Sequence, residues 1–117
     1  MPDELNDASL HNGLVVLTTV ETQEEGVRLA RLLVEGELAA CVQILPQMVS
    51  IYRWQGSVEQ SSEALLLIKT TRTVYSQLET VIKQHHSYQT PEIIALPIES
   101  GLPEYLVWLR DSVKLPF

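Results

Sequence analysis

The chain has a single cysteine, Cys41, in 117 residues, so one chain can form no internal disulfide. This scarcity is typical of proteins in a reducing compartment. Apolar runs are short, and none approaches the roughly 20 residues needed to cross a bilayer. Residues 1–12 are polar and acidic, and they lack the basic start and apolar centre of a signal peptide. These absences predict a cytoplasmic protein that does not enter membranes.

Basic side chains are also few. The sequence has 8 Lys and Arg against 15 Asp and Glu, which gives a net charge of −7. Nucleic-acid binding generally requires clusters of Lys and Arg that neutralise phosphates. Because the bases here are scattered and outnumbered, nucleic acid and anionic membrane surfaces are not expected partners. The length fits one domain, which we place at residues 13–117, after a flexible tail over residues 1–12.

Stretches of apolar and β-branched residues predict strands at residues 14–20, 38–54, 57–70 and 92–98. The second and third stretches are long and are separated by Gln55-Gly56, a turn signal, so they predict a long central hairpin. Pro46 interrupts the second stretch, and a proline within a strand indicates an edge, a bend or a bulge.

Three helices are expected between and after these strands. Thr22 is suited to cap the first, and Glu25 three positions later completes a capping box. Gly36 is expected to end that helix. Its predicted inner face consists of Val27, Leu29, Ala30, Leu33 and Val34. The second helix is expected over residues 72–86, and the last begins near Pro103, because proline suits the first helical turn.

The order β-α-β-β-α-β plus a C-terminal helix predicts an α+β, ferredoxin-like domain. A sheet with helices on only one face normally alternates apolar and polar residues. Residues 14–17, 64–68 and 93–96 do not alternate, which indicates burial of both faces. A single chain has no further element to cover the second face, and the long hairpin also offers unpaired strand edges. We therefore predict self-association.

His85 and His86 stand at the end of the second predicted helix. Histidine is the commonest protein metal ligand, so the pair suggests a metal site. Adjacent helical residues diverge by about 100°, so joint coordination requires the helix to end at His86 or a ligand from another chain. Two structural interpretations stay open: His85 continues an apolar stripe and can be a packed side chain, and either imidazole can interact favourably with the helix C-terminus.

A second group of side chains combines aromatic rings with charge: Tyr52, Trp54, Lys69, Tyr88, Glu92 and Trp108. Aromatic residues near a hairpin tip are typical of subunit interfaces, and a small-ligand pocket between subunits is the other interpretation. Cys41 has small apolar neighbours, which favour a structural thiol. The sequence has no recognisable nucleophile or phosphate-binding motif, so we do not expect an enzyme.

Several segments carry a resemblance to a known family: Ala39-Ala40-Cys41-Val42, Tyr52-x-Trp54-x-Gly56, Leu67-Ile68-Lys69-Thr70 and His86-x-Tyr88-x-x-Pro91-Glu92-Ile93. Through them the chain resembles the divalent-cation tolerance family CutA over residues 14–108. The resemblance implies a homotrimer built by packing of sheets and pairing of strands. It also implies that the aromatic and charged residues named above line clefts between subunits.

Enterobacterial members of this family bind copper through a cysteine of the first strand and a histidine pair. The resemblance carries metal ligation over to His85 and His86, whereas Thr18 stands at the cysteine position. Threonine is a poor substitute for the thiolate that suits Cu(I). We therefore expect weak binding of Cu(II) through imidazole, with copper not required for folding.

Together with these observations, the resemblance implies a small cytoplasmic homotrimer of divalent-cation tolerance that binds copper or similar ions weakly. The alternative is a trimer that senses small molecules or acts as a scaffold, because the predicted architecture resembles that of the PII signalling proteins. Loss of His85 and His86 would change ion binding in the first case. Loss of Lys69 or Tyr88 would change small-molecule binding in the second.

Overall fold

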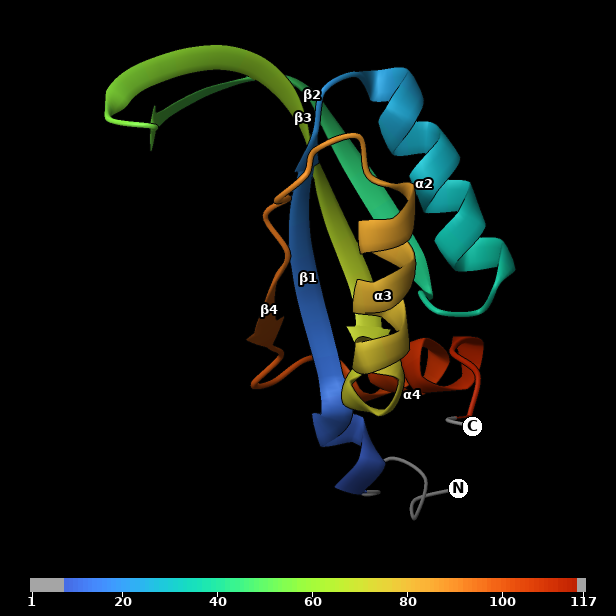
Figure 1. Cartoon of the computed structure of the whole chain (residues 1–117). Helices are drawn as coiled ribbons and strands as arrows, with labels where there is room; N and C mark the ends of the chain where they lie inside the picture. The colour runs from blue at the N-terminus through green and yellow to red at the C-terminus, as the bar shows by residue number, and fades with distance from the viewer. Residues whose placement is uncertain (1–7, 116–117) are drawn as a thin grey trace.

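The computed structural model describes residues 8–115 and has the α+β architecture that the sequence predicts (Figure 1). In chain order its elements are η1 (Ala8–Asn12), β1 (Gly13–Val20), α2 (Gln23–Glu35), β2 (Cys41–Trp54), β3 (Ser57–Thr71), η2 (Arg72–Val74), α3 (Tyr75–His85), β4 (Ile94–Pro97) and α4 (Pro103–Ser112). The predicted order of strands and α-helices is confirmed. The two short 3-10 segments, η1 and η2, were not predicted.

The four strands form one antiparallel sheet in the order β2-β3-β1-β4. β2 and β3 make the predicted hairpin, and its turn holds Gln55 and Gly56 at φ values of 49° and 84°. Positive φ at both positions is characteristic of a type I′ turn, whose twist matches that of the flanking strands. The hairpin extends and curves beyond the other elements (Figure 1), which gives the molecule dimensions of 54 × 25 × 22 Å.

The irregularity predicted at Pro46 is a break in the pairing of β2 with β3. The register shifts between Leu45 and Met48, and Gln47 adopts a φ of 58°. A bulge of this kind bends the strand and increases its twist. The hairpin beyond Met48 is therefore directed away from the sheet plane, and it overhangs the end of β1 (Figure 1).

The hydrophobic core lies between one face of the sheet and the helices α2 and α3. Its fully buried side chains include Val16, Leu66 and Ile68 from the sheet and Leu33, Leu78 and Ile82 from the helices. Gly26 lets α2 approach the sheet closely, because a Cβ atom there would lie 3.2 Å from Cδ1 of Leu66. The alternation of buried residues along β1 and β3 thus marks the face that the helices cover.

The start of α2 follows the capping prediction in part. The Thr22 hydroxyl accepts a hydrogen bond from the Glu25 N–H at 3.1 Å, which satisfies one free donor of the first turn. The Glu25 side chain does not complete a capping box. It reaches instead to Ser87, in the loop after α3.

Other sequence-based boundaries were wrong in detail. The inner face of α2 is narrower than predicted, since Val27 and Val34 are 39% and 40% exposed. Gly36 caps the end of α2, as predicted, but its φ is −83°, and the left-handed residue is the next one, Glu37, at φ 59°. The predicted strand 92–98 shortens to β4, and α3 begins only at Tyr75. Residues 8–12, expected in the tail, form η1 with a buried Leu10, and residues 1–7 lie outside the described residues.

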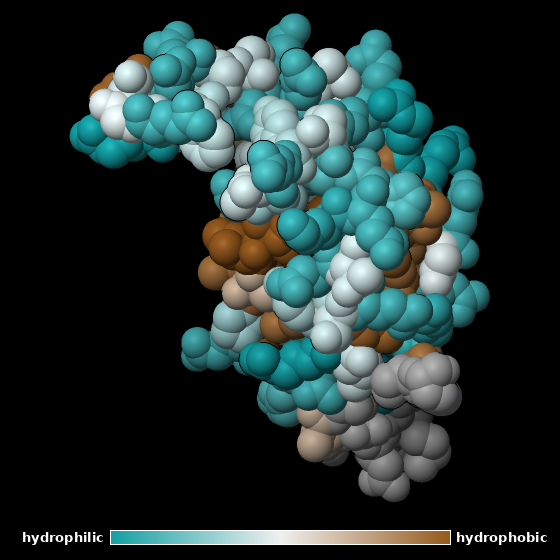
Figure 2. All heavy atoms as spheres, viewed as in Figure 1, coloured by the Kyte–Doolittle hydropathy of each residue, from teal (hydrophilic) through white to brown (hydrophobic). Residues whose placement is uncertain are grey.

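The sheet face that α2 and α3 leave uncovered is apolar. Its members alternate with the core residues along each strand and include Val15, Leu17, Leu65, Leu67, Ile94 and Leu96. The last two are each 49% exposed. Figure 2 shows hydrophobic residues gathered below the overhanging hairpin, in the area of β1 and β4. Large contiguous apolar surfaces on a soluble chain usually mark an interaction site.

Candidate functional site

The loop between α3 and β4 carries three of the predicted site residues, His86, Tyr88 and Glu92, and His86 fixes its start. The Nε2–H of His86 donates to the backbone carbonyl of Thr19 on β1 at 2.8 Å. Its Nδ1 accepts from the backbone N–H of Tyr88 at 3.0 Å. These two bonds define a neutral imidazole with both nitrogens engaged. His86 thus joins the loop to the sheet, and neither nitrogen is available to a metal in this arrangement.

His85 is placed differently, at the last position of α3. Its side chain is exposed, and Nδ1 donates to the carbonyl of Val81 one turn earlier at 3.0 Å. The packed interpretation of His85 was therefore wrong, and the helix C-terminus interpretation is the one that its geometry fits. Nε2 has no partner among the described residues, so it is a nitrogen with a free lone pair.

A hollow of about 630 Å³ surrounds the histidine pair and is bordered by Glu21, Glu25 and Gln84. Glu25 is only 9% exposed, and its two carboxylate oxygens accept from the N–H and the hydroxyl of Ser87 at 3.1 and 3.0 Å. Within residues 8–115, no three His, Cys, Asp or Glu side chains are grouped closely enough to hold a metal ion. The hollow therefore offers an exposed imidazole beside carboxylates rather than a closed coordination shell.

Thr18 does not line this hollow. It lies on the helix-covered side of β1, is completely buried, and its hydroxyl has no hydrogen-bond partner in the described part of the chain. The hydroxyl is therefore not bonded to either histidine. The position that corresponds to the family cysteine is thus a core position.

Tyr88 connects the same loop to β3. Its hydroxyl donates to Oε2 of Glu63 at 2.7 Å, and its ring lies against that of His86 with centroids 4.9 Å apart. Burial, followed by the hydrogen bond and charge of Glu63, raises the pKa of the Tyr88 phenol well above its ordinary value of 10.0. The phenol therefore stays protonated and stays a donor.

Four of the six predicted cleft residues line a single cleft of about 730 Å³: Tyr52, Trp54, Tyr88 and Glu92. Its lining residues come from the distal half of the hairpin, from the end of β1 and the turn after it, and from the loop that leads to β4. The Tyr52 hydroxyl accepts from the Ser61 hydroxyl at 3.4 Å across the hairpin. In Figure 2 the hairpin overhangs a hollowed part of the surface at this place.

The other two predicted residues lie elsewhere. Lys69 is six positions from Glu63 along β3, which separates the two Cα atoms by about 20 Å. Its ammonium donates to Oε1 of Gln43, and its cross-strand partner is Cys41. Cys41 is half-buried on the uncovered sheet face, so in one chain it is less shielded than its neighbours in sequence predict.

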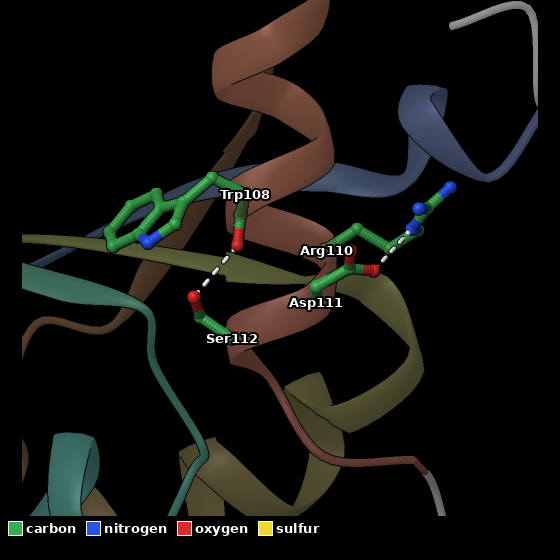
Figure 3. Close-up of polar contacts among 4 residues, drawn as sticks. All are labelled: Trp108, Arg110, Asp111 and Ser112. Carbon is green, nitrogen blue, oxygen red and sulfur yellow. Dashed lines mark hydrogen bonds and ion pairs between the residues drawn. The ribbon is translucent and has the colours of Figure 1, made fainter. Parts of the chain in front are cut away.

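Trp108 projects from α4, away from the Arg110–Asp111 ion pair (Figure 3). Its backbone carbonyl accepts from the Ser112 hydroxyl at 2.7 Å, and its indole is 46% exposed beside Tyr105. The indole takes no part in the cleft of one chain. The single chain thus separates Lys69 and Trp108 from the other four residues.

Sequence reasoning missed Glu63 and the contact of Glu25 with Ser87. Glu63 stands directly before the apolar part of β3. An acidic side chain next to a run of buried residues indicates that a specific hydrogen-bond partner or positive charge faces it. Glu25 was assigned to a local capping box, and that assignment hid its contact with Ser87, which is 62 positions away.

Comparisons with known proteins agree with the sequence motifs. The family described as "CutA1 divalent ion tolerance protein" matches residues 14–112. A Thermus thermophilus protein named divalent-cation tolerance protein CutA is 51% identical over 98 residues, which cover 84% of this chain and 95% of the relative. An Arabidopsis thaliana protein named "Protein CutA, chloroplastic" is 44% identical over 86% of this chain and 56% of its own length.

Solved structures show the same likeness. The Thermus thermophilus protein superimposes with a TM-score of 0.85 at 49% identity, over 87% of this chain and 99% of that one. CutA1 from Oryza sativa superimposes with a TM-score of 0.86 at 43% identity, over 88% and 94%. Within residues 8–115 no helix is long and apolar enough to span a membrane. With its motifs, its fold and its relatives in agreement, the chain belongs to the CutA1 divalent ion tolerance family.

Proposed function

We propose that this protein contributes to divalent-cation tolerance by binding copper or similar divalent ions weakly, without catalysing a reaction. Family membership supports the role in tolerance. The geometry of His85 supports the weak binding, because its Nε2 is exposed and unengaged while both nitrogens of His86 are held by backbone groups. One imidazole with nearby carboxylates suits Cu(II) better than Cu(I), which prefers thiolates.

Calorimetric titration with Cu(II) tests this proposal. Wild type is expected to bind, His85→Ala to lose most of the binding, and His86→Gln to keep it. Metal ligation requires a neutral imidazole, so protons compete with the metal and binding weakens in acidic solution. Equal binding by wild type and His85→Ala would contradict the proposal. A thermal scan of each variant without metal serves as the control for folding.

We also propose that the functional unit is a cytoplasmic homotrimer of ferredoxin-like domains. The half-exposed Ile94 and Leu96 and the rest of the uncovered apolar face support self-association. The strand order β2-β3-β1-β4 supports the ferredoxin-like assignment. The number three rests on the family resemblance, and the single cysteine supports a reducing compartment.

Sedimentation equilibrium at micromolar concentration is expected to give three times the chain mass. The labelling rate of the Cys41 thiol, which lies on the uncovered face, provides a second measurement of assembly. The thiol is expected to react slowly with a thiol reagent in the assembled protein and quickly after dissociation. A stable folded monomer with a rapidly labelled Cys41 would refute the assembly proposal.

The cleft gives a second candidate function, in which small molecules are sensed or held between subunits. The observation that favours it is the convergence of Tyr52, Trp54, Tyr88 and Glu92 on one cavity of ligand size. Lys69 and Trp108 belong to this site only if a neighbouring copy supplies them. Ligand binding that depends on Tyr88 and not on His85 would separate this function from metal binding.

A further inference from the structure

In one chain, the cleft beneath the hairpin is acidic, and no base lines it among the described residues. Three carboxylates line it, from Glu21, Glu63 and Glu92, and its remaining lining residues are aromatic, aliphatic, hydroxyl or amide side chains. Carboxylates around a hollow with partly apolar walls create a strong negative potential there, because the field is poorly screened. The cleft is therefore complementary to positive charge.

The arrangement of these acids distinguishes between kinds of cation. In the part of the chain that the structure describes, no three acidic, histidine or cysteine side chains are close enough to share a metal ion. The three carboxylates are thus spread around the cleft walls and do not converge on one point. A small inorganic ion therefore could not be held by all three at once, whereas a larger organic cation could lie among them.

Aromatic side chains in the same cleft favour the organic cation. Trp54 and Tyr52 are 53% and 43% exposed there, and Tyr88 lies on the opposite wall. The face of an aromatic ring attracts ammonium and guanidinium groups, and cages of such rings recognise quaternary ammonium ligands. The Tyr88 hydroxyl is committed to Glu63, which holds the ring in place.

Glu63 supplies the third argument. Its side chain is 9% exposed, and its one hydrogen-bond donor among the described residues is the Tyr88 phenol, through Oε2. Oε1 of Glu63 therefore keeps its capacity to accept a hydrogen bond or to pair with a positive charge. A cation in the cleft would provide that charge next to Oε1.

We propose that this cleft binds a small organic cation, in which an ammonium or guanidinium group lies against Tyr52, Trp54 and Tyr88 and is paired with Glu63. The inference deepens the second candidate function, since it names the chemistry of the ligand. It is independent of metal binding at His85.

The test compares choline with 3,3-dimethylbutan-1-ol, a neutral molecule of the same shape, by ligand-observed NMR and calorimetry on the assembled protein. Choline is expected to bind at least about tenfold more tightly than the neutral probe. Glu63→Gln and Trp54→Leu are expected to weaken choline binding by a similar factor. The amide introduced by Glu63→Gln keeps an oxygen that can accept from Tyr88, so the wall of the cleft is retained. Glu99→Gln, outside the cleft, removes the same charge and is expected to leave binding unchanged.

Four other outcomes would contradict the inference. Equal binding of the two probes, or equal effects of Glu63→Gln and Glu99→Gln, would show that charge in the cleft is not recognised. If only the neutral probe binds, and Trp54→Leu abolishes that binding, the cleft does bind ligands but does not select cations. Failure of both probes would refute the inference, whereas the second candidate function would still be tested by Tyr88-dependent binding of other small molecules and the first by Cu(II) titration.

Discussion

Replacement of Thr18 by valine is expected to stabilise this protein. The Thr18 side chain is completely buried on β1, and its hydroxyl has no hydrogen-bond partner in the described structure. Valine has nearly the same shape and removes the polar group. The neighbouring strand offers a matched control, because Thr70 on β3 is equally buried but donates to the carbonyl of Leu38 at 2.7 Å.

The two substitutions should change stability in opposite directions. A buried polar group without a partner costs about 1–3 kcal/mol, so Thr18→Val should gain about 1 kcal/mol at the low end of that range. Thr70→Val loses a buried hydrogen bond and leaves the Leu38 carbonyl without its donor, at a cost of about 1–2 kcal/mol. For a chain of this length, 1 kcal/mol corresponds to a shift in Tm of about 4 °C.

Scanning calorimetry at one fixed protein concentration measures both effects, since assembly makes Tm depend on concentration. The expected order of Tm, from highest to lowest, is Thr18→Val, wild type, Thr70→Val. A Tm for Thr18→Val at or below that of wild type would show that its hydroxyl is satisfied, and the description of this core position would be wrong.

Three further predictions concern the loop after α3 and the hairpin. Glu25→Ala removes the acceptor of both Ser87 hydrogen bonds, so amide exchange at Ser87 should become faster, while the exposed Glu24→Ala on the same turn should leave it unchanged. Because the pKa of Tyr88 is raised in the folded state, its contribution to stability is complete below about pH 10 and decreases as the pH rises above that value. The urea midpoint should therefore fall more between pH 9 and pH 11 in wild type than in Tyr88→Phe, which lacks the phenol. Gly56→Ala should cost about 1 kcal/mol in urea unfolding although its surroundings are open, because φ is +84°.

Local features of the fold could be predicted from the sequence because their causes lie within a few residues. The Thr22 cap, the Gln55-Gly56 turn and the irregularity at Pro46 each depend on backbone preferences of the residues concerned. The width of the buried face of α2 depends on how closely the sheet approaches. Gly26 lies close against Leu66 of β3, whereas Val34 on the same helix is exposed, and the helical period of the sequence does not encode this difference.

The candidate site was less predictable, because its contacts join distant parts of the chain. The bond from His86 to Thr19 spans 67 positions, and that from Tyr88 to Glu63 spans 25. Sequence motifs brought attention to the two histidines as an equivalent pair. Only the three-dimensional arrangement distinguishes them, with one engaged by the backbone at both nitrogens and the other free at Nε2.

Pulsed electron paramagnetic resonance of the Cu(II)-loaded protein tests the central proposal, metal binding at His85, most directly. The measurement detects imidazole nitrogen bound to copper, and a His11→Ala background removes the third and only other histidine of the chain. Imidazole coupling is predicted in this background and in its His86→Gln variant, and it should disappear in the His85→Ala variant. Coupling that persists without His85 and disappears without His86 would contradict the proposal.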